Sequence, residues 1–166
     1  MNLEIVEYKP EYKKNYKDLN YEWLNKYFEV ESSDKKILFN PETEIIDKNG
    51  FIFFALCEDK VVGTCTLIRH DDANYELSKL CVTEKYQRKG IGEKLIDRAI
   101  SKACQVGCQK IFLSTNRKLI VAYNLYRKKG FTIIKNPHVF TSNYKRESIY
   151  MYLDLLFTSD EVMLRK

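Results

Sequence analysis

Six consecutive residues in the middle of the chain have the composition of a phosphate-binding loop. Segment 87–92 reads Gln-Arg-Lys-Gly-Ile-Gly and directly precedes an amphipathic stretch. Gly90 and Gly92 lack Cβ atoms, so the backbone can approach a ligand closely, and a helix start offers unpaired N–H groups and the positive end of its dipole. Gln87, Arg88 and Lys89 add hydrogen-bond donors and charge. The segment predicts a pyrophosphate site.

A Gly-x-Gly pair alone is also typical of a plain tight turn before a helix. Here the pair follows a strand-like stretch and is accompanied by basic side chains, which favours phosphate binding. A Walker A loop is excluded because Gly-Lys-Ser/Thr is absent at the right spacing, and a Rossmann fingerprint lacks its third glycine. We therefore do not expect either class of nucleotide-binding fold.

Apolar periodicity predicts a mixed α/β domain that places this loop between a strand and a helix. An unbroken apolar run over 51–57 and strand-like stretches over 61–68 and 75–82 predict an antiparallel meander upstream of the loop. Downstream, apolar side chains recur every three or four positions over 92–104, as in an amphipathic helix. Further strands are predicted at 3–8, 110–114, 131–135 and 148–153, and helical segments at 10–27, 35–39 (capped by Ser32 or Ser33), from 41 and at 119–129.

The composition indicates one folded domain over residues 1–166. Hydrophobic residues make up 45% of the chain, and no linker or repeat divides it. Neither a signal peptide nor an apolar run of membrane-spanning length is present, so we expect a cytoplasmic protein without a membrane partner. The net charge of +5 comes from scattered residues without a recognition motif, which disfavours a nucleic-acid partner.

The cysteines and histidines predict neither a disulfide framework nor a metal site. Five cysteines are an odd number, and we expect reduced, packed thiols with structural roles. His70 and His138 are far apart and lack ligand spacing, so no metal is expected. The sequence His70-Asp71-Asp72 offers possible ligands, but a polar hairpin turn before Asn74 is the favoured interpretation.

Several segments together resemble the GNAT superfamily of N-acetyltransferases. Segment 87–92 matches its acetyl-CoA motif Arg/Gln-x-x-Gly-x-Gly/Ala, and segment 125–131, Leu-Tyr-Arg-Lys-Lys-Gly-Phe, is similar to its LYxxxGF signature. Segments 61–64 and 76–82 are similar to its third and fourth strands. The resemblance covers most of residues 51–131, and two motifs in the right order are more specific than either alone.

This resemblance implies a central, mostly antiparallel sheet of six to seven strands flanked by helices. The fourth and fifth strands would splay apart into a V-shaped acetyl-CoA cleft, where pantetheine pairs with the backbone like an additional strand. Many members carry asparagine seven residues before the tyrosine, where this chain has Leu119, and Asn116 is the expected substitute. The coenzyme-binding residues implied are Leu80, Cys81, Val82, Gln87, Arg88, Lys89, Gly90, Ile91, Gly92, Glu93, Asn116 and Tyr126.

The implied reaction is direct transfer of an acetyl group from acetyl-CoA to a primary amine in a ternary complex. An amine with a pKa of about 10.4 must lose a proton before it attacks, and Glu76 is the candidate general base. Alternatively, Glu76 orders Lys79 or binds the amine without taking its proton. Tyr126 matches the family's general-acid position and would donate to the departing thiolate; the alternative is simple packing against Phe131.

Two further features concern the acyl carbon. The amide of Leu80 or Val82 is expected to polarise the thioester carbonyl, which requires backbone geometry rather than a side chain. A covalent acetyl-Cys81 mechanism is disfavoured because no histidine lies nearby in sequence to activate the thiol.

The acceptor is the least legible part of the sequence. We expect a small-molecule or peptide amine, and a protein that is a monomer or homodimer. Glu31 and Asp34 can also be read as solvated helix residues. A non-catalytic acyl-CoA binding or sensing module is the alternative function. The candidate acceptor-binding residues are Tyr27, Glu31, Asp34 and Tyr144.

Overall fold

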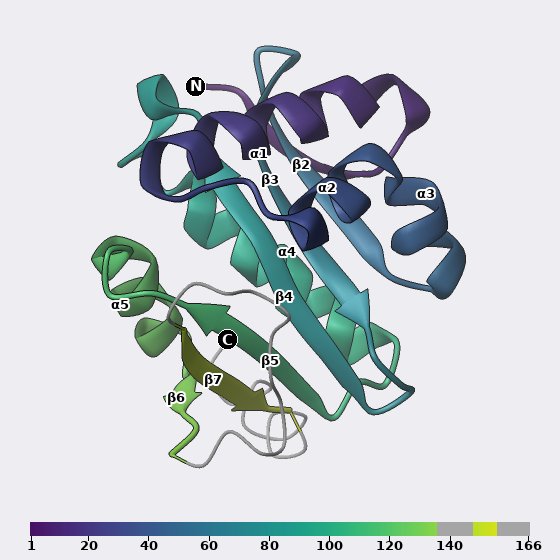
Figure 1. The fold of residues 1–166 in the computed structure, drawn as a ribbon, viewed down its shortest axis with the longest axis vertical. Coiled ribbons are helices and arrows are strands. Elements are labelled where there is room, and N and C mark those ends of the chain that lie inside the picture. Colours follow the sequence, from purple (N-terminus) through teal and green to yellow (C-terminus); the bar gives the residue numbers. More distant parts are fainter. Residues whose placement is uncertain (136–147, 156–166) are drawn as a thin grey trace.

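A seven-stranded sheet forms the centre of the domain (Figure 1). The computed structural model describes residues 1–135 and 148–155. The strand order is β1-β2-β3-β4-β5-β7-β6. Within the described residues β4 and β5 pair in parallel, and the other neighbouring strands pair antiparallel. The strands are β1 (Leu3–Glu7), β2 (Phe51–Cys57), β3 (Lys60–Arg69), β4 (Asn74–Val82), β5 (Lys110–Thr115), β6 (Thr132–Ile133) and β7 (Ile149–Asp154).

Helices cover both faces of this sheet. In Figure 1, α1 (Lys13–Tyr27), α2 (Ser32–Phe39) and α3 (Pro41–Glu44) lie on the near face, and α4 (Ile91–Gln105) lies on the far face. The fifth helix, α5 (Ile120–Lys128), follows β5 and lies beyond its end. Short 3-10 turns occupy Pro10–Tyr12, Ile46–Lys48 and Glu84–Tyr86. The result is a three-layer arrangement with a separate hydrophobic core on each face of the sheet.

The two cores explain the unbroken apolar run of β2. Phe53 and Ala55 belong to the core that packs against α4, whereas Ile52 and Phe54 belong to the core beneath α1 to α3. Successive side chains of a strand point to opposite faces, so a strand covered on both faces is apolar throughout. The predicted strand at 51–57 coincides with β2. The expected mixed α/β, mostly antiparallel sheet is confirmed.

Two local expectations are wrong. The residue that precedes α2 and caps it is Glu31, not Ser32 or Ser33; its side chain binds the backbone of Asp34, and the Asp34 side chain binds the backbone of Glu31 in return. This reciprocal arrangement satisfies two N–H groups at the helix start. In addition, Cys104 is exposed, although the other four cysteines are buried as expected.

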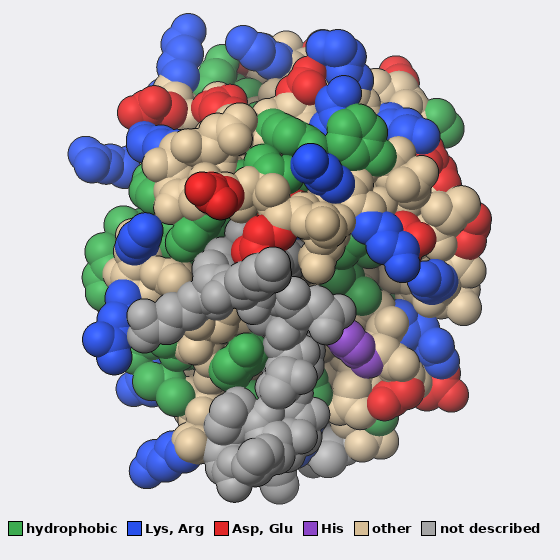
Figure 2. Space-filling model, viewed as in Figure 1, with side chains coloured by type: hydrophobic (Ala, Val, Ile, Leu, Met, Phe, Trp, Pro, Cys, Tyr) green, Lys and Arg blue, Asp and Glu red, His purple; other side chains and the backbone are tan. Residues whose placement is uncertain are grey.

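The β3–β4 connection is the polar turn predicted at 70–74. The Asp71 carboxylate accepts hydrogen bonds from the backbone N–H groups of Ala73 and Asn74, at 2.8 and 2.9 Å. On the face shown in Figure 2, Lys and Arg side chains are distributed around the outline with Asp and Glu among them. None of the helices in the described ranges is long and apolar enough to cross a membrane.

Candidate active site

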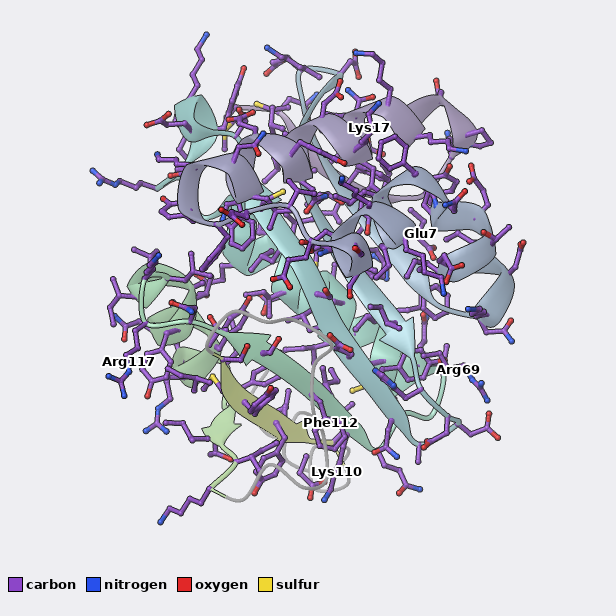
Figure 3. All side chains as sticks on the ribbon, in the orientation of Figure 1. Glu7, Lys17, Arg69, Lys110, Phe112 and Arg117 are labelled. Carbon is purple, nitrogen blue, oxygen red and sulfur yellow. The ribbon has the colours of Figure 1, made fainter. Side chains whose placement is uncertain are left out.

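A cleft opens where β4 and β5 separate. These strands pair only through Asn74–Lys110, Tyr75–Ile111 and Glu76–Phe112. Beyond Glu76, β4 continues to Val82 while β5 remains paired with β7 as far as Thr115. Figure 3 marks Lys110 and Phe112 at the joined end of β5 and Arg117 beyond its separated end. The predicted splay of the fourth and fifth strands is therefore present.

The cleft between the separated strands has a volume of about 100 Å³. One wall comes from β4, the other from the end of β5 and the residues after it, and α5 closes the base. Trp23 and Phe28 border it from the α1 side. The cleft is lined by Trp23, Phe28, Leu77, Ser78, Lys79, Leu80, Ser114, Thr115, Asn116, Leu119, Ala122, Tyr126 and Ser148.

A β-bulge interrupts β4 inside this cleft. Ser78 pairs with Thr66 and Cys81 pairs with Thr64, so Lys79 and Leu80 together oppose one residue of β3. Lys79 has a φ of +53°, in the left-handed region. A bulged residue drops out of the ladder, and here β5 has already diverged. The backbone of Leu80 therefore has no register partner on either side, which suits pairing with an extended ligand.

Lys79 itself is held by a carboxylate from the opposite layer. Its ammonium contacts Asp34 of α2, and the two side chains are 4% and 0% exposed. The interpretation of Asp34 as a solvated helix residue is therefore wrong, and so is the alternative in which Glu76 orders Lys79. Asp34 carries a cation already, and we do not assign it to an acceptor amine.

Glu76 forms a different pair. Its Oε1 lies 2.9 Å from Nε2 of His70, which stands on the turn after β3. The hydrogen bond to Glu76 raises the pKa of His70 above its usual range, more than partial burial lowers it. Glu76 is the last β4 residue paired with β5, next to Leu77 at the start of the cleft. From the sequence, His70 is interpreted as part of a polar turn rather than as a metal ligand, and its pairing with Glu76 is missed. Its position six residues before Glu76 in a hairpin is the signal that could have revealed this pair.

Tyr126 projects from α5 to the base of the cleft. Its side chain is buried, and its ring centroid lies 5.8 Å from that of Phe131. Burial, and secondarily the Cys65 thiol, raises the pKa of Tyr126 far above its ordinary value. Across residues 1–135 and 148–155 its hydroxyl has no hydrogen-bond partner. Tyr126 is thus a neutral donor at the cleft, in addition to packing against Phe131.

Thr115 was not among the residues singled out in the sequence. Its Oγ1 is fully shielded from solvent and has no hydrogen-bond partner in the part of the chain that the structure describes. An unpaired buried hydroxyl is costly and requires an explanation. Thr115 is among the residues that border the cleft, so a ligand group bound there is the candidate partner of this hydroxyl.

Cys81 lies in β4 beside the cleft, with its thiol directed elsewhere. The side chain is 5% exposed, and its Sγ donates to Oδ1 of Asn20 in α1 over 3.7 Å. Burial, and then the Glu22 carboxylate, raises the pKa of the Cys81 thiol to about 12. A nucleophilic cysteine requires the thiolate, so these surroundings disfavour a covalent acetyl-cysteine. Any coenzyme contact at Cys81 would use its backbone.

The loop at 87–92 forms the entrance to α4. Gly90 caps the helix with a φ of +78°, and no side chain caps the helix start. Gln87, Arg88 and Lys89 are exposed, and the Gln87 side chain donates to the Val82 carbonyl at 2.9 Å. Backbone N–H groups at an uncapped helix start bind anions well. This loop has the form expected of a pyrophosphate site.

Three predicted coenzyme residues also have structural roles. Ile91 is 1% exposed and packs in the α4 core, so any contact of this residue with a coenzyme would use its backbone. Glu93 pairs with Lys128 and Lys129 at the end of α5, at 3.0 and 2.8 Å. Asn116 accepts a hydrogen bond from the backbone of Lys118 at 3.0 Å and borders the cleft. Their contacts with a coenzyme remain predictions.

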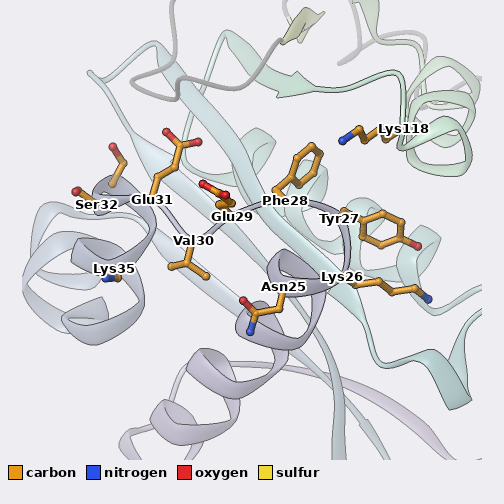
Figure 4. A pocket seen from close by; sticks show the side chains of 11 residues that line it. Asn25, Lys26, Tyr27, Phe28, Glu29, Val30, Glu31, Ser32, Lys35 and Lys118 are labelled. Atoms are coloured by element: carbon orange, nitrogen blue, oxygen red, sulfur yellow. The ribbon is translucent and has the colours of Figure 1, made fainter.

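A second, larger hollow adjoins the cleft on the side of α1 and α2 (Figure 4). It has a volume of about 780 Å³ and is formed by the end of α1, the connection to α2, the start of α2 and Lys118. Tyr27 and Glu31 both line it, as does Phe28, which borders the cleft too. Asp34 is not among its lining residues, and Tyr144 lies outside the described residues.

Comparisons with known proteins agree with this geometry. The sequence model of the Acetyltransferase (GNAT) family matches residues 17–131. The uncharacterized N-acetyltransferase YvbK of Bacillus subtilis is 30% identical over 136 residues, which is 74% of this chain and 88% of the relative.

Two solved structures have the same fold. A GNAT-family acetyltransferase of Staphylococcus aureus superposes with a TM-score of 0.83 at 27% identity, over 93% of this chain and 99% of the other. A Bacillus subtilis acetyltransferase in complex with CoA gives a TM-score of 0.67 at 24% identity, over 93% and 100%.

Proposed function

Because this chain belongs to the GNAT family of acetyltransferases, we propose that it transfers an acetyl group from acetyl-CoA to a primary amine by direct attack in a ternary complex. The observation that carries this proposal is the cleft between β4 and β5, which combines an unpaired β4 edge at Leu80 with a neutral phenol at Tyr126. The larger hollow shown in Figure 4, which we call the acceptor hollow, adjoins this cleft through Phe28.

The donor fits the cleft and the loop in one extended arrangement. We propose that pantetheine lies along the β4 edge from Leu80 to Val82, and that the pyrophosphate lies against the N–H groups at the start of α4. The absence of a side-chain cap on α4 supports the second contact, and the unpaired Thr115 hydroxyl supports the first. Gln87, Arg88 and Lys89 add exposed donors and charge beside the phosphates.

The acceptor is proposed to enter from the hollow lined by Tyr27 and Glu31. Its neutral nitrogen attacks the thioester carbon, the carbon–sulfur bond breaks and the excess proton leaves the nitrogen. Glu76 is the proposed base for that proton, directly or through water. Its hydrogen bond to the half-buried His70 supports this role, because His70 connects Glu76 to the exposed surface.

Departure of coenzyme A as a thiolate requires a donor near the sulfur. Tyr126 is proposed to provide it. The raised pKa of Tyr126 makes full proton transfer to a thiolate with a pKa near 8.5 unfavourable, so hydrogen-bond stabilisation of the thiolate is the larger part of its role. Polarisation of the carbonyl by the Leu80 amide completes the proposed site.

A panel of amines and peptides, with release of free thiol from acetyl-CoA as the readout, tests this proposal. We expect thiol release that depends on both the acceptor and acetyl-CoA, with double-reciprocal lines that intersect as in a ternary-complex mechanism. Binding of acetyl-CoA by calorimetry together with silence across a broad panel would instead favour a non-catalytic acyl-CoA module. Parallel lines would contradict direct attack.

A further inference from the structure

A buried ion pair joins the acceptor side of the molecule to the donor cleft. The Lys79 ammonium of β4 contacts the Asp34 carboxylate of α2, and both side chains are almost fully shielded from solvent. Desolvation of two buried charges offsets most of their attraction, and an apolar pair of similar volume is often at least as stable. The pair is therefore better explained by the geometry that it imposes than by stability.

At the donor end, the pair fixes the β4 bulge. Lys79 adopts the left-handed conformation, with a φ of +53°, which a non-glycine residue keeps only when surrounding contacts impose it. The contact with Asp34 fixes the end of the Lys79 side chain on the α2 side of the sheet. The next residue is Leu80, whose backbone borders the cleft without a register partner.

On the side of the acceptor hollow, the Asp34 carboxylate also holds the backbone of Glu31. Oδ1 of Asp34 contacts Lys79, and Oδ2 accepts a hydrogen bond from the backbone N–H of Glu31 at 2.9 Å. Glu31 lines the acceptor hollow. One carboxylate group thus connects Glu31, which lines the larger hollow, with the β4 bulge, which lines the cleft.

We propose that the Asp34–Lys79 ion pair is a positioning device. It aims the Leu80 amide at the acyl carbonyl and holds Glu31, which lines the acceptor hollow, at a fixed position relative to that amide. This inference rests on the proposed function. Asp34 and Lys79 act through the backbone of Leu80 and Glu31, so both are positioning residues. Small displacements of such groups have large effects, because oxyanion-type stabilisation depends on a preorganised donor.

The test uses the double variant Asp34→Asn/Lys79→Met. Asparagine keeps an oxygen for the Glu31 N–H, and methionine keeps most of the side-chain length without the charge. We expect a folded protein with acetyl-CoA affinity near that of wild type and a kcat lower by roughly 10- to 100-fold. The matched control is Lys102→Met, which removes the partly buried ion pair between Lys102 of α4 and Glu7 of β1 and should leave kcat unchanged.

A spectroscopic readout separates positioning from general damage. Acetyl-CoA labelled with carbon-13 at the carbonyl is bound to each protein, and its carbonyl stretching band is recorded by difference infrared spectroscopy. A hydrogen bond from the Leu80 amide lowers this frequency, so the band should move to higher frequency in the double variant and not in Lys102→Met. This measurement requires no acceptor.

The outcomes are distinguishable. An unchanged carbonyl band and an unchanged kcat in the double variant would overturn the inference. If the double variant does not fold, Asp34→Glu decides, because it keeps the charge and moves the carboxylate by one methylene group; a wild-type kcat in that variant would also overturn it. If wild type shows no turnover with any amine, the proposed function fails, while the carbonyl band still tests the ion pair.

Discussion

Replacement of Gly90 by alanine tests the phosphate-binding loop against a built-in control. Gly90 and Gly107 stand at opposite ends of α4, with φ angles of +78° and +79°. A Cβ atom added at either position would meet no heavy atom within 4 Å. The two substitutions therefore introduce the same backbone strain and no steric clash, but only Gly90 lies in the proposed pyrophosphate site.

The magnitudes follow from this geometry. The left-handed conformation costs an L-residue roughly 1 to 2 kcal/mol, so both variants should lose a similar amount of stability, or about 2 to 8 °C in Tm for a chain of this size. In the proposed site, a methyl group at position 90 would also crowd the phosphates beside the start of α4. Loss of one hydrogen bond to a charged group costs about 1.5 to 3 kcal/mol, which corresponds to roughly 10- to 150-fold in Kd.

The assay is calorimetric titration of acetyl-CoA and of dephospho-CoA into wild type, Gly90→Ala and Gly107→Ala. We expect Gly90→Ala to weaken binding of both ligands by similar factors, because both contain the pyrophosphate, and Gly107→Ala to bind them as wild type does. Equal affinities in the two variants, at equal loss of stability, would refute the assignment of this loop to the pyrophosphate.

Three other substitutions test the remaining groups. Tyr126→Phe removes a hydroxyl without a protein partner, so we expect wild-type stability and a kcat lower by about 10- to 150-fold; Tyr123→Phe on the same helix is the control, and turnover within twofold of wild type would remove Tyr126 from the mechanism. Thr115→Val should keep or raise the Tm of the free protein and weaken acetyl-CoA binding by about 2- to 10-fold, whereas unchanged affinity would show that no ligand group reaches this hydroxyl. The hydrogen bond to Glu76 raises the pKa of His70. The stability that this pair contributes is therefore complete below the unfolded pKa of about 6.5 and is lost as pH rises through the folded pKa. In urea unfolding, His70→Asn should have a lower free energy of unfolding than wild type at pH 5.5, with a difference that shrinks toward pH 9; a difference that does not change with pH would contradict the charged pair.

The main elements of the fold are legible from local sequence because each carries its own pattern. The continuous apolar run of β2 indicates a strand that is buried on both faces. The apolar residues at every third or fourth position of α4 indicate a helix that is buried on one face. The order of the strands is less accessible. β7 lies between β5 and β6, and that insertion depends on packing between segments whose local patterns are equally compatible with other edge positions.

The site was accessible only where its residues fall in contiguous motifs. The loop around Gly90 and the tyrosine of α5 could be found this way. The contact between Asp34 and Lys79 joins residues 45 positions apart, and neither side chain lies in an unusual local pattern. The exposure of Cys104 and the unpaired Thr115 hydroxyl are likewise consequences of three-dimensional packing, which composition and spacing do not encode.

The short seam between β4 and β5 has a consequence for how the domain opens. Within residues 1–135 and 148–155, three register pairs between β4 and β5 join the β1–β4 half of the sheet to the half formed by β5, β7 and β6. Hydrogen-bonded units with few mutual contacts exchange their amide hydrogens through separate opening events. Both halves contribute to the core that packs against α4, so we expect early exchange at the seam itself rather than two separate units, and a ligand that bridges the two strands should slow that exchange. Coenzyme A bound between β4 and β5 would then connect the two strands where the polypeptide itself forms no ladder between them.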